Sequence, residues 1–212
     1  TAALRALSAD QLSSLSATQM AALTTAQVAS LNADQLAGLS TTNLNALGTA
    51  HFANLSAAQV AALTAAQVAK LETADVAALG TAALRGLGAD AIAALTTAQA
   101  EALTSAQLAA FSAVQLGAME TADVAAIITA DIKALTPAAL ASLSAEQLGS
   151  LSAGQIAALT TAHVAALETA DLRAITPTVI PSLTTAQIQA LSLVQVAALT
   201  TAQVRALETA DL

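Results

Sequence analysis

The chain contains no cysteine, tryptophan or tyrosine, and its aromatic residues are limited to Phe52 and Phe111. Without cysteine it forms neither disulfides nor thiolate metal sites, and this absence is compatible with the cytosol and with the exterior. Basic residues are also scarce, since 6 Lys and Arg stand against 14 acidic residues, and they form no cluster. A nucleic-acid partner is therefore not expected, because phosphate binding needs concentrated positive charge.

Long apolar runs are missing as well. Ser, Thr, Gln or Asp recurs within every eight residues, so no segment of about 20 apolar residues could form a membrane span. The chain opens on Thr1, and neither Met nor a signal peptide is visible in the printed sequence. Regularly spaced Leu, Val and Ile nevertheless provide apolar surface to bury, which argues against disorder.

What the sequence does have is a repeat of eight residues, here called an octad. Stepping by eight from Leu7 to Leu207 meets an apolar residue every time, which is called position one. Position six is equally apolar, from Leu12 to Leu212, with Ala100 as its smallest member. Position two is mostly Ser or Thr, and position five is mostly Gln. Residues 1–212 therefore form a single continuous octapeptide-repeat array.

This pattern predicts one helix start per octad. Ser or Thr at the N-cap accepts a hydrogen bond from the first turn, and Gln three residues later accepts one from the cap residue. Pro137 and Pro177 fall at the first helical position, and Gly48, Gly80 and Gly88 occupy the cap. The expected fold class is all-α, a repeat solenoid or superhelix of very short capped helices, one per eight-residue unit.

Two other folds fit less well. In one continuous helix the apolar stripe would rotate by about 80° per octad, and Pro181 would break that helix. Ala and Gln are poor strand formers, which argues against a β-solenoid. Helices of about six residues are unstable alone, so stability is expected from stacking that buries positions one and six. The small residues at position eight predict close helix–helix approach, and the Gln series could form ladders between successive octads.

A longer period is carried by acidic octads that replace the cap with Glu and position five with Asp. The pairs are Glu72 with Asp75, Glu120 with Asp123, Glu168 with Asp171, and Glu208 with Asp211. Their spacings of 48, 48 and 40 residues equal six, six and five octads. A spacing of five octads would be out of phase with a rigid coil of two or three octads. The spacings therefore predict that the octads are structurally near-equivalent and that no such coil forms. The paired carboxylates are weak candidates for Ca²⁺ ligands. Alternatively, they complement the helix dipole and need no ligand.

No catalytic or cofactor-binding residue is expected. His51 and His163 replace the position-five Gln, which favours a capping or solvent-facing role for both. The many hydroxyl groups come without a Ser-His-Asp constellation, and no Gly-rich phosphate loop is present. The chain is therefore not expected to be an enzyme. One solvated outer face is expected for the basic residues at position seven, which are Arg5, Arg85, Lys133, Arg173 and Arg205.

Runs close to Leu-Thr-Thr-Ala-Gln-Val-Ala-Ala-Leu begin at Leu23, Leu159 and Leu199. They resemble the octapeptide arrays of large, low-complexity proteins of Proteobacteria, which are often secreted or surface-associated. The resemblance covers the whole chain and implies an extracellular or cell-surface setting. Its motif is structural and carries over no functional residue.

Both ends of the chain cut through an octad, which predicts a segment of a longer array or a filament subunit that associates head to tail or laterally. The leading hypothesis is a structural extracellular bacterial repeat protein, either a filament subunit or the stalk of an adhesin or surface layer. A solenoid binding module, with Ca²⁺ bound by the acidic octads, is the alternative. A minor alternative is ice binding by the pairs Thr24-Thr25, Thr96-Thr97, Thr160-Thr161, Thr184-Thr185 and Thr200-Thr201.

Overall fold

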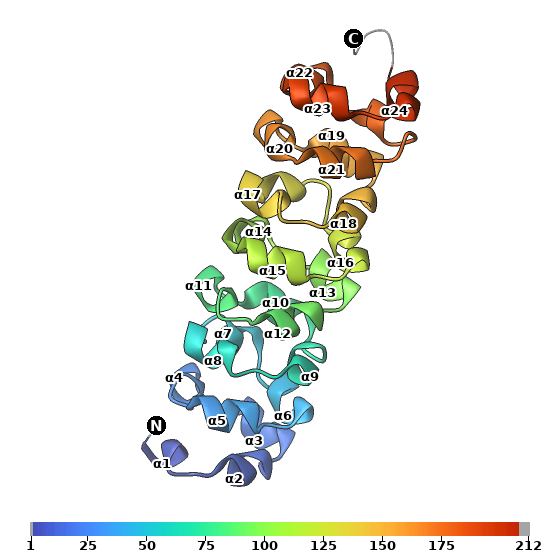
Figure 1. Ribbon diagram of the computed structural model, residues 1–212. Helices are drawn as coiled ribbons and strands as arrows, with labels where there is room; N and C mark the ends of the chain where they lie inside the picture. Colours follow the sequence, from blue (N-terminus) through green and yellow to red (C-terminus); the bar gives the residue numbers. More distant parts are fainter. Residues whose placement is uncertain (1, 208–212) are drawn as a thin grey trace. The chain divides into compact units, whose positions relative to one another are not determined.

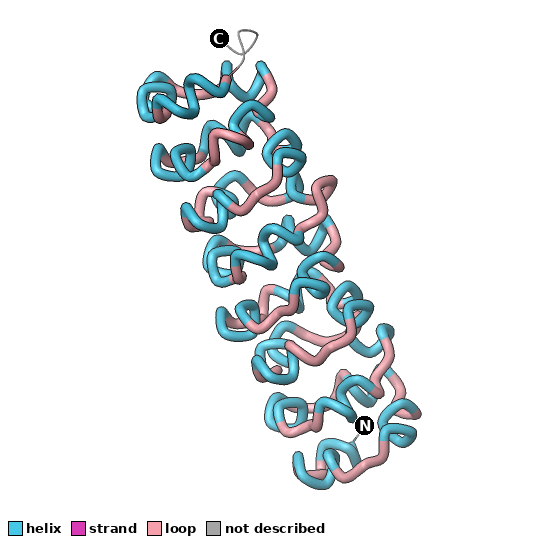
Figure 2. Tube along the Cα trace, turned by 90° about the vertical axis from the view of Figure 1, so that its right-hand side faces the viewer, coloured by secondary structure: helices cyan, strands magenta, loops and turns pink. Residues whose placement is uncertain are grey.

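The computed structural model describes residues 2–207. Within this range the chain forms 24 α-helices of four to six residues and two 3₁₀ helices, with no strand (Figure 2). The predicted all-α fold with one short helix per octad is therefore confirmed. By its internal contacts the chain divides into two compact units, residues 1–110 and 111–212. The division falls between two octads and leaves the repeat register uninterrupted.

Unit 1 holds fourteen helices among its described residues. They are α1 (Ala2–Arg5), α2 (Ala9–Ser13), α3 (Ala17–Ala21), α4 (Thr25–Val28), α5 (Ala33–Ala37), α6 (Thr41–Asn45), α7 (Thr49–Phe52), α8 (Ala57–Ala61), α9 (Ala65–Val68), α10 (Thr73–Ala78), α11 (Thr81–Leu84), α12 (Ala89–Ala93), α13 (Thr97–Glu101) and α14 (Ser105–Ala110).

Unit 2 holds the remaining elements. They are α15 (Ala113–Ala118), α16 (Thr121–Ala126), η1 (Ile132–Ala134), α17 (Pro137–Leu140), α18 (Ala145–Gly149), α19 (Ala153–Ala158), α20 (Thr161–Ala166), α21 (Thr169–Ala174), η2 (Ile180–Ser182), α22 (Thr185–Gln189), α23 (Leu193–Ala198) and α24 (Thr201–Ala206).

The helices begin where the capping pattern predicts. Thr96 has extended backbone angles and accepts a bond at its Oγ1 from the Gln99 N–H at 3.3 Å. The Gln99 Oε1 in turn accepts the Thr96 N–H at 2.8 Å. These two bonds satisfy donors that a helix N-terminus otherwise leaves without partners. The same reciprocal pair recurs in most octads, so a short local sequence signal sets each helix start.

Most helices end with a tightened turn in which the next position-one N–H bonds a carbonyl three residues back. Leu103 N–H, for example, donates to the Ala100 carbonyl at 3.3 Å. No described residue, glycine included, adopts a positive φ. The chain therefore reverses direction without a left-handed cap, which is why Leu can occupy position one.

Helices stack on the helix that lies three octads further along the chain, so three octads, or 24 residues, make one coil. In unit 1 the helices α2, α5, α8, α11 and α14 form one such column (Figure 1). In unit 2 the helices α16, α18, α21 and α23 form another. The prediction that no rigid coil of three octads forms was wrong. The 48-residue spacing of the acidic octads corresponds to two coils, which places Glu120 and Glu168 in the same column.

Positions one and six make the core, as predicted. Leu36, Phe52 and Val60 at position six are fully buried, and Leu47 at position one is 2 % exposed. Alanine at most other positions keeps side chains thin, so neighbouring coils bring their backbones close together. The core is therefore a continuous apolar interior within each unit, to which every octad contributes one residue from its helix and one from the segment between helices.

Two octads depart from the pattern and form 3₁₀ helices. The prediction that Pro177 begins a helix was wrong, because residues 177–179 form a turn that precedes η2. Pro181 lacks the N–H that would bond the Pro177 carbonyl and close the first α-helical turn. In the other case, Ile128 occupies the cap position and offers no side-chain acceptor before η1.

Candidate functional site

The junction between coils is built around the position-five side chain. The Gln99 Nε2 group donates to the carbonyls of Val68 and Leu71, both at 2.8 Å, and the side chain is 1 % exposed. Leu71 lies 28 residues earlier, which is three octads plus the four positions from position one to position five. One carboxamide thus begins its own helix with its oxygen and bonds the preceding coil with its nitrogen.

This arrangement, here called the coil clasp, recurs throughout both units. The distances from Nε2 to a position-one carbonyl lie between 2.6 and 3.0 Å. The Gln residues concerned are Gln35, Gln59, Gln67, Gln99 and Gln107 in unit 1, and Gln147, Gln155, Gln187, Gln195 and Gln203 in unit 2. The predicted Gln ladder therefore exists, but it joins octads of adjacent coils and not successive octads.

The clasp has a clear physical cause. The last carbonyls of an α-helix have no partner inside that helix. Gln67 Nε2 donates to the carbonyls of Leu36 and Ala37 at the end of α5, and to that of Leu39 just beyond it. Helices of four to six residues consist almost entirely of such ends. The clasp therefore supplies a donor to the Leu39 carbonyl that water would otherwise have to provide, and adds a second bond at the Leu36 carbonyl, which also accepts the Leu39 N–H.

Asn and His can take the place of Gln. Asn43 Nδ2 donates to the carbonyls of Ser13 and Leu15 at 2.9 and 3.0 Å. His163 Nδ1 accepts the Thr160 N–H at 3.1 Å, and its Nε2 lies 2.7 Å from the Leu135 carbonyl. Because Nδ1 accepts, the donor must be a proton on Nε2, which is the neutral tautomer.

The two His residues thus reproduce the carboxamide's acceptor and donor. His51 makes the equivalent contacts with the Gly48 N–H and the Leu23 carbonyl. The predicted capping role is confirmed for both. The alternative prediction, that the side chain faces solvent, was wrong for His163, which is 2 % exposed.

Position seven provides hydrogen bonds in the opposite direction. Arg5 Nε donates to the Ser30 carbonyl at 3.0 Å, and Arg85 Nε donates to the Ala110 carbonyl at 3.3 Å. Each acceptor lies 25 residues later, in the next coil. Arg5 belongs to α1 and Arg85 follows α11, and these helices lie in different columns. The prediction of one solvated face for the basic residues was therefore wrong within unit 1, because three octads complete each coil.

Backbones approach closely at position eight, as predicted. A Cβ added to Gly86 would overlap the carbonyl group of Ala57 in the preceding coil, and one added to Gly38 would overlap the Ala9 side chain. Ser142 instead uses this approach for a hydrogen bond from its Oγ to the Ala113 carbonyl at 2.9 Å.

The acidic octads place one carboxyl inside and one outside. Glu72, Glu120 and Glu168 are exposed, whereas Asp75, Asp123 and Asp171 are 3 to 6 % exposed. Burial raises the pKa of Asp75 to about 6, helped by the negative charge of Glu72 and opposed by His51. Burial also raises the pKa of Asp171, although the Glu168 N–H bonds its Oδ2 at 2.8 Å and opposes the shift.

The carboxyl groups of the acidic octads do not converge on a metal site. Residues 2–207 contain no cluster of three His, Asp or Glu side chains suited to a metal ion. Glu208 and Asp211 lie outside the described residues. The calcium hypothesis thus stays a prediction. No helix in the described range is both long and apolar enough to traverse a lipid bilayer.

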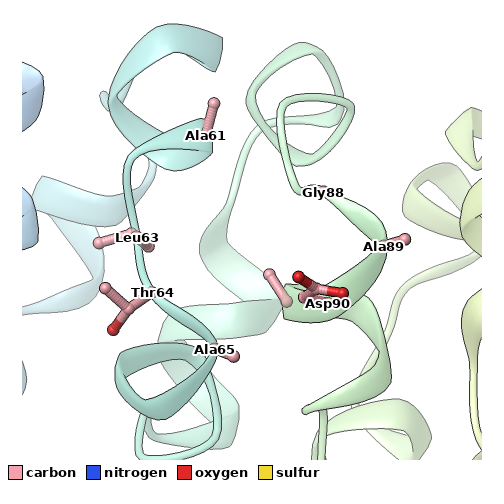
Figure 3. Close-up of a pocket in the computed structure, with 8 residues that line it drawn as sticks. Ala61, Leu63, Thr64, Ala65, Gly88, Ala89 and Asp90 are labelled. Atoms are coloured by element: carbon pink, nitrogen blue, oxygen red, sulfur yellow. The ribbon is translucent and has the colours of Figure 1, made fainter.

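Among the unit 1 junctions without a clasp, the one at Ala91 opens into a cavity of about 380 Å³. Ala91 stands at position five and Gly88 at the cap, so both side chains of the capping box are missing. The wall on one side is formed by Ala61, Leu63, Thr64 and Ala65, and on the other by Gly88, Ala89 and Asp90 (Figure 3). From the sequence, Gly88 was predicted only to be a tolerated residue at the cap position. The signal for the cavity was nevertheless visible, because this octad has Gly88 in place of the cap Ser or Thr and Ala91 in place of the Gln.

The family model of the ALTTAQ repeat matches residues 20–49, 41–71, 68–105, 124–161 and 164–201. These matches cover more than half of the chain, so the protein belongs to the ALTTAQ repeat family. Its class is that of tandem repeat proteins that form short-helix solenoids. No curated protein matches the chain.

Proposed function

We propose that the chain is a structural element of the bacterial cell surface or an extracellular assembly, as a filament subunit or as the stalk of an adhesin or surface layer. The observation that carries this proposal is the coil clasp. Each coil offers amide donors toward the preceding coil and carbonyl acceptors toward the following one, with the same spacing. A surface of this kind can be extended by any further coil, from the same chain or from another molecule.

The two outermost described coils show which groups a further coil would contact, whether that coil belongs to the same chain or to another molecule. Gln11 and Gln19 cap their own helices, but their amide nitrogens have no acceptor within residues 2–207. At the other end Val196 and Val204 occupy position six, which is buried elsewhere, yet they are 46 % and 43 % exposed. A stacked coil would bury these apolar side chains and receive the Gln donors.

Negative-stain electron microscopy of the purified 212-residue chain, with and without Ca²⁺, tests the proposal. Long uniform fibres would support a filament subunit, and isolated rods would support a stalk. Compact globular particles would contradict both. Protease treatment of intact cells that express the protein tests the location, because a surface protein is degraded while cytosolic controls persist.

Two variants separate head-to-tail from lateral contacts. Val204→Asp places a charge on the last described coil, whereas Val114→Asp changes a side chain that is 73 % exposed on α15. Loss of fibres in the first variant alone indicates head-to-tail stacking, and loss in the second alone indicates lateral association. Circular dichroism of both variants checks that the helices are retained.

A solenoid binding module remains the second candidate function. The clasp-free cavity beside Gly88 favours it, because it exposes polar backbone groups that ordinary junctions use internally. In either case a non-enzymatic role is expected, because the octads repeat like residues, whereas a catalytic site needs unlike residues that converge.

A further inference from the structure

The cavity between Leu63 and Gly88 is lined by one backbone N–H donor and two carbonyl acceptors without partners among the described residues. At an ordinary junction the cap N–H donates to Gln Oε1, and Gln Nε2 donates to carbonyls 28 to 31 residues earlier. Counting back from Ala91, those acceptors are the carbonyls of Leu63, Ala61 and Val60. Within residues 2–207 the Gly88 N–H makes no hydrogen bond, and neither the Ala61 nor the Leu63 carbonyl accepts one.

We propose that this cavity is a binding site for a primary carboxamide, in particular the side chain of a glutamine from a partner polypeptide. The ligand oxygen would accept the Gly88 N–H, and its nitrogen would donate to the Leu63 and Ala61 carbonyls. The protein itself provides the template, since Gln67 and Gln99 make these contacts at equivalent positions in the same unit. This inference is independent of the structural role proposed above.

Space and access are consistent with this ligand. A Cβ added to Gly88 meets no atom within 4 Å, so there is open space beside this glycine at the cavity wall. The neighbouring octad also lacks both side chains, with Gly80 and Ala83, and a Cβ on Gly80 would make ordinary van der Waals contact with the Ala53 carbonyl oxygen at 3.9 Å. Unpartnered backbone groups are costly when dry, so a ligand that satisfies three of them is favoured over an apolar one.

The cavity also discriminates against acids. A carboxylate has the shape of a carboxamide but no donor, so its second oxygen would face the Leu63 carbonyl. Asp90 lines the cavity and is exposed, which adds like-charge repulsion. A tertiary amide keeps the acceptor oxygen but has no N–H. Propionamide, propionate and N,N-dimethylpropionamide therefore form a matched series.

The test is titration of the full chain, observed by the amide resonances of Gly88 and Leu63. Propionamide should cause saturable shifts there with a dissociation constant on the order of 10 mM, as expected for so small a ligand. Propionate and the tertiary amide should not. Ala91→Gln should abolish the response by filling the site, whereas Ala98→Gln, which adds the same group at an exposed position of α13, should retain it.

A complementary variant creates the same site elsewhere. Gln99→Ala removes the carboxamide next to the Val68 and Leu71 carbonyls, and propionamide should raise the melting temperature of this variant more than that of the unaltered chain. Equal shifts with all three probes, an absence of saturation, or an unchanged response in Ala91→Gln would each overturn the proposal and leave a solvent-filled gap.

Discussion

The amide nitrogen of Gln99 lies 2.8 Å from the carbonyl oxygen of Leu71, 28 residues earlier in the chain. That bond joins two coils, and the oxygen of the same side chain caps the N-terminus of α13. Local and tertiary structure therefore depend on one side chain, and substitutions can separate its two roles.

Gln99→Ala should destabilise unit 1 by about 2–3 kcal/mol, because it removes the cap acceptor and the donor to two carbonyls. The Leu71 carbonyl is then left without a donor among the described residues, whereas the Val68 carbonyl keeps the Leu71 N–H. Gln11→Ala is the control, since Gln11 is exposed and serves only as a cap. It should reduce stability by less than about 1 kcal/mol. Urea unfolding followed by circular dichroism measures both. Equal losses would show that the bonds between coils contribute nothing beyond capping.

Asp75→Asn should stabilise the protein above pH 6 and have little effect near pH 4. The pKa of Asp75 is raised from 3.8 to about 6 in the folded state. The folded state therefore holds its proton more tightly, and stability falls as pH rises between these values, by about 1–2 kcal/mol. The Asn variant should remove that slope, since Asn43 has the shape of Asp and bonds the preceding coil through its amide.

Thermal unfolding of both proteins between about pH 4 and pH 8 measures the effect of Asp75→Asn. The titratable groups that act on this carboxyl are Glu72 and His51, and Glu101 lies on the next helix of the column. Asp90→Asn is the matched control because Asp90 is exposed. A slope that persists in Asp75→Asn, or disappears in Asp90→Asn, would assign the pH dependence to another group.

Gly86→Ala and Gly88→Ser should have opposite effects. At Gly86 the added Cβ would overlap the Ala57 carbonyl, so the coils must separate, at a cost of about 1–3 kcal/mol. At Gly88 the added Cβ meets no neighbour and the hydroxyl provides the missing N-cap, which should stabilise α12 by about 0.3 kcal/mol. Melting temperatures that change in the same direction would contradict this interpretation of the two glycines.

Leu103→Asp should disrupt stacking, whereas Ala98→Ser should be nearly silent. Leu103 is 2 % exposed at position one, and a buried unpaired carboxylate there costs several kcal/mol. Ala98 is exposed on the outer side of α13. Comparable losses of thermal stability in the two variants would mean that the core positions are wrongly assigned.

Millimolar Ca²⁺ should leave the melting temperature unchanged. Asp75 and Asp171 are buried while their Glu partners are exposed, so the two carboxyl groups of an acidic octad do not face a common ligand position. Calorimetric titration checks the same point directly. Saturable heat at millimolar Ca²⁺ would contradict this expectation and support the calcium-binding version of the function.

The helix starts, the core positions and the two histidine caps were predictable from the sequence. Thr96 and Gln99 are only three residues apart, so the bonds between them follow from a local pattern that the sequence shows directly. Likewise, Ala100 and Leu103 lie at the two apolar positions that recur in every octad, and both are buried. By contrast, the helix start at Pro177 was wrongly predicted because its outcome depends on Pro181, which removes the next hydrogen-bond donor.

The number of octads per coil was decided by the tertiary structure alone. A pattern that is identical in every octad fixes each helix, but the angle between successive helices depends on how distant backbones pack. Only when Gln99 reaches Val68 and Leu71 does a coil of three octads acquire its own hydrogen bonds. The cavity at Gly88 and the burial of Asp75 follow from that closure, because a missing or acidic position-five side chain matters only where another coil lies against it.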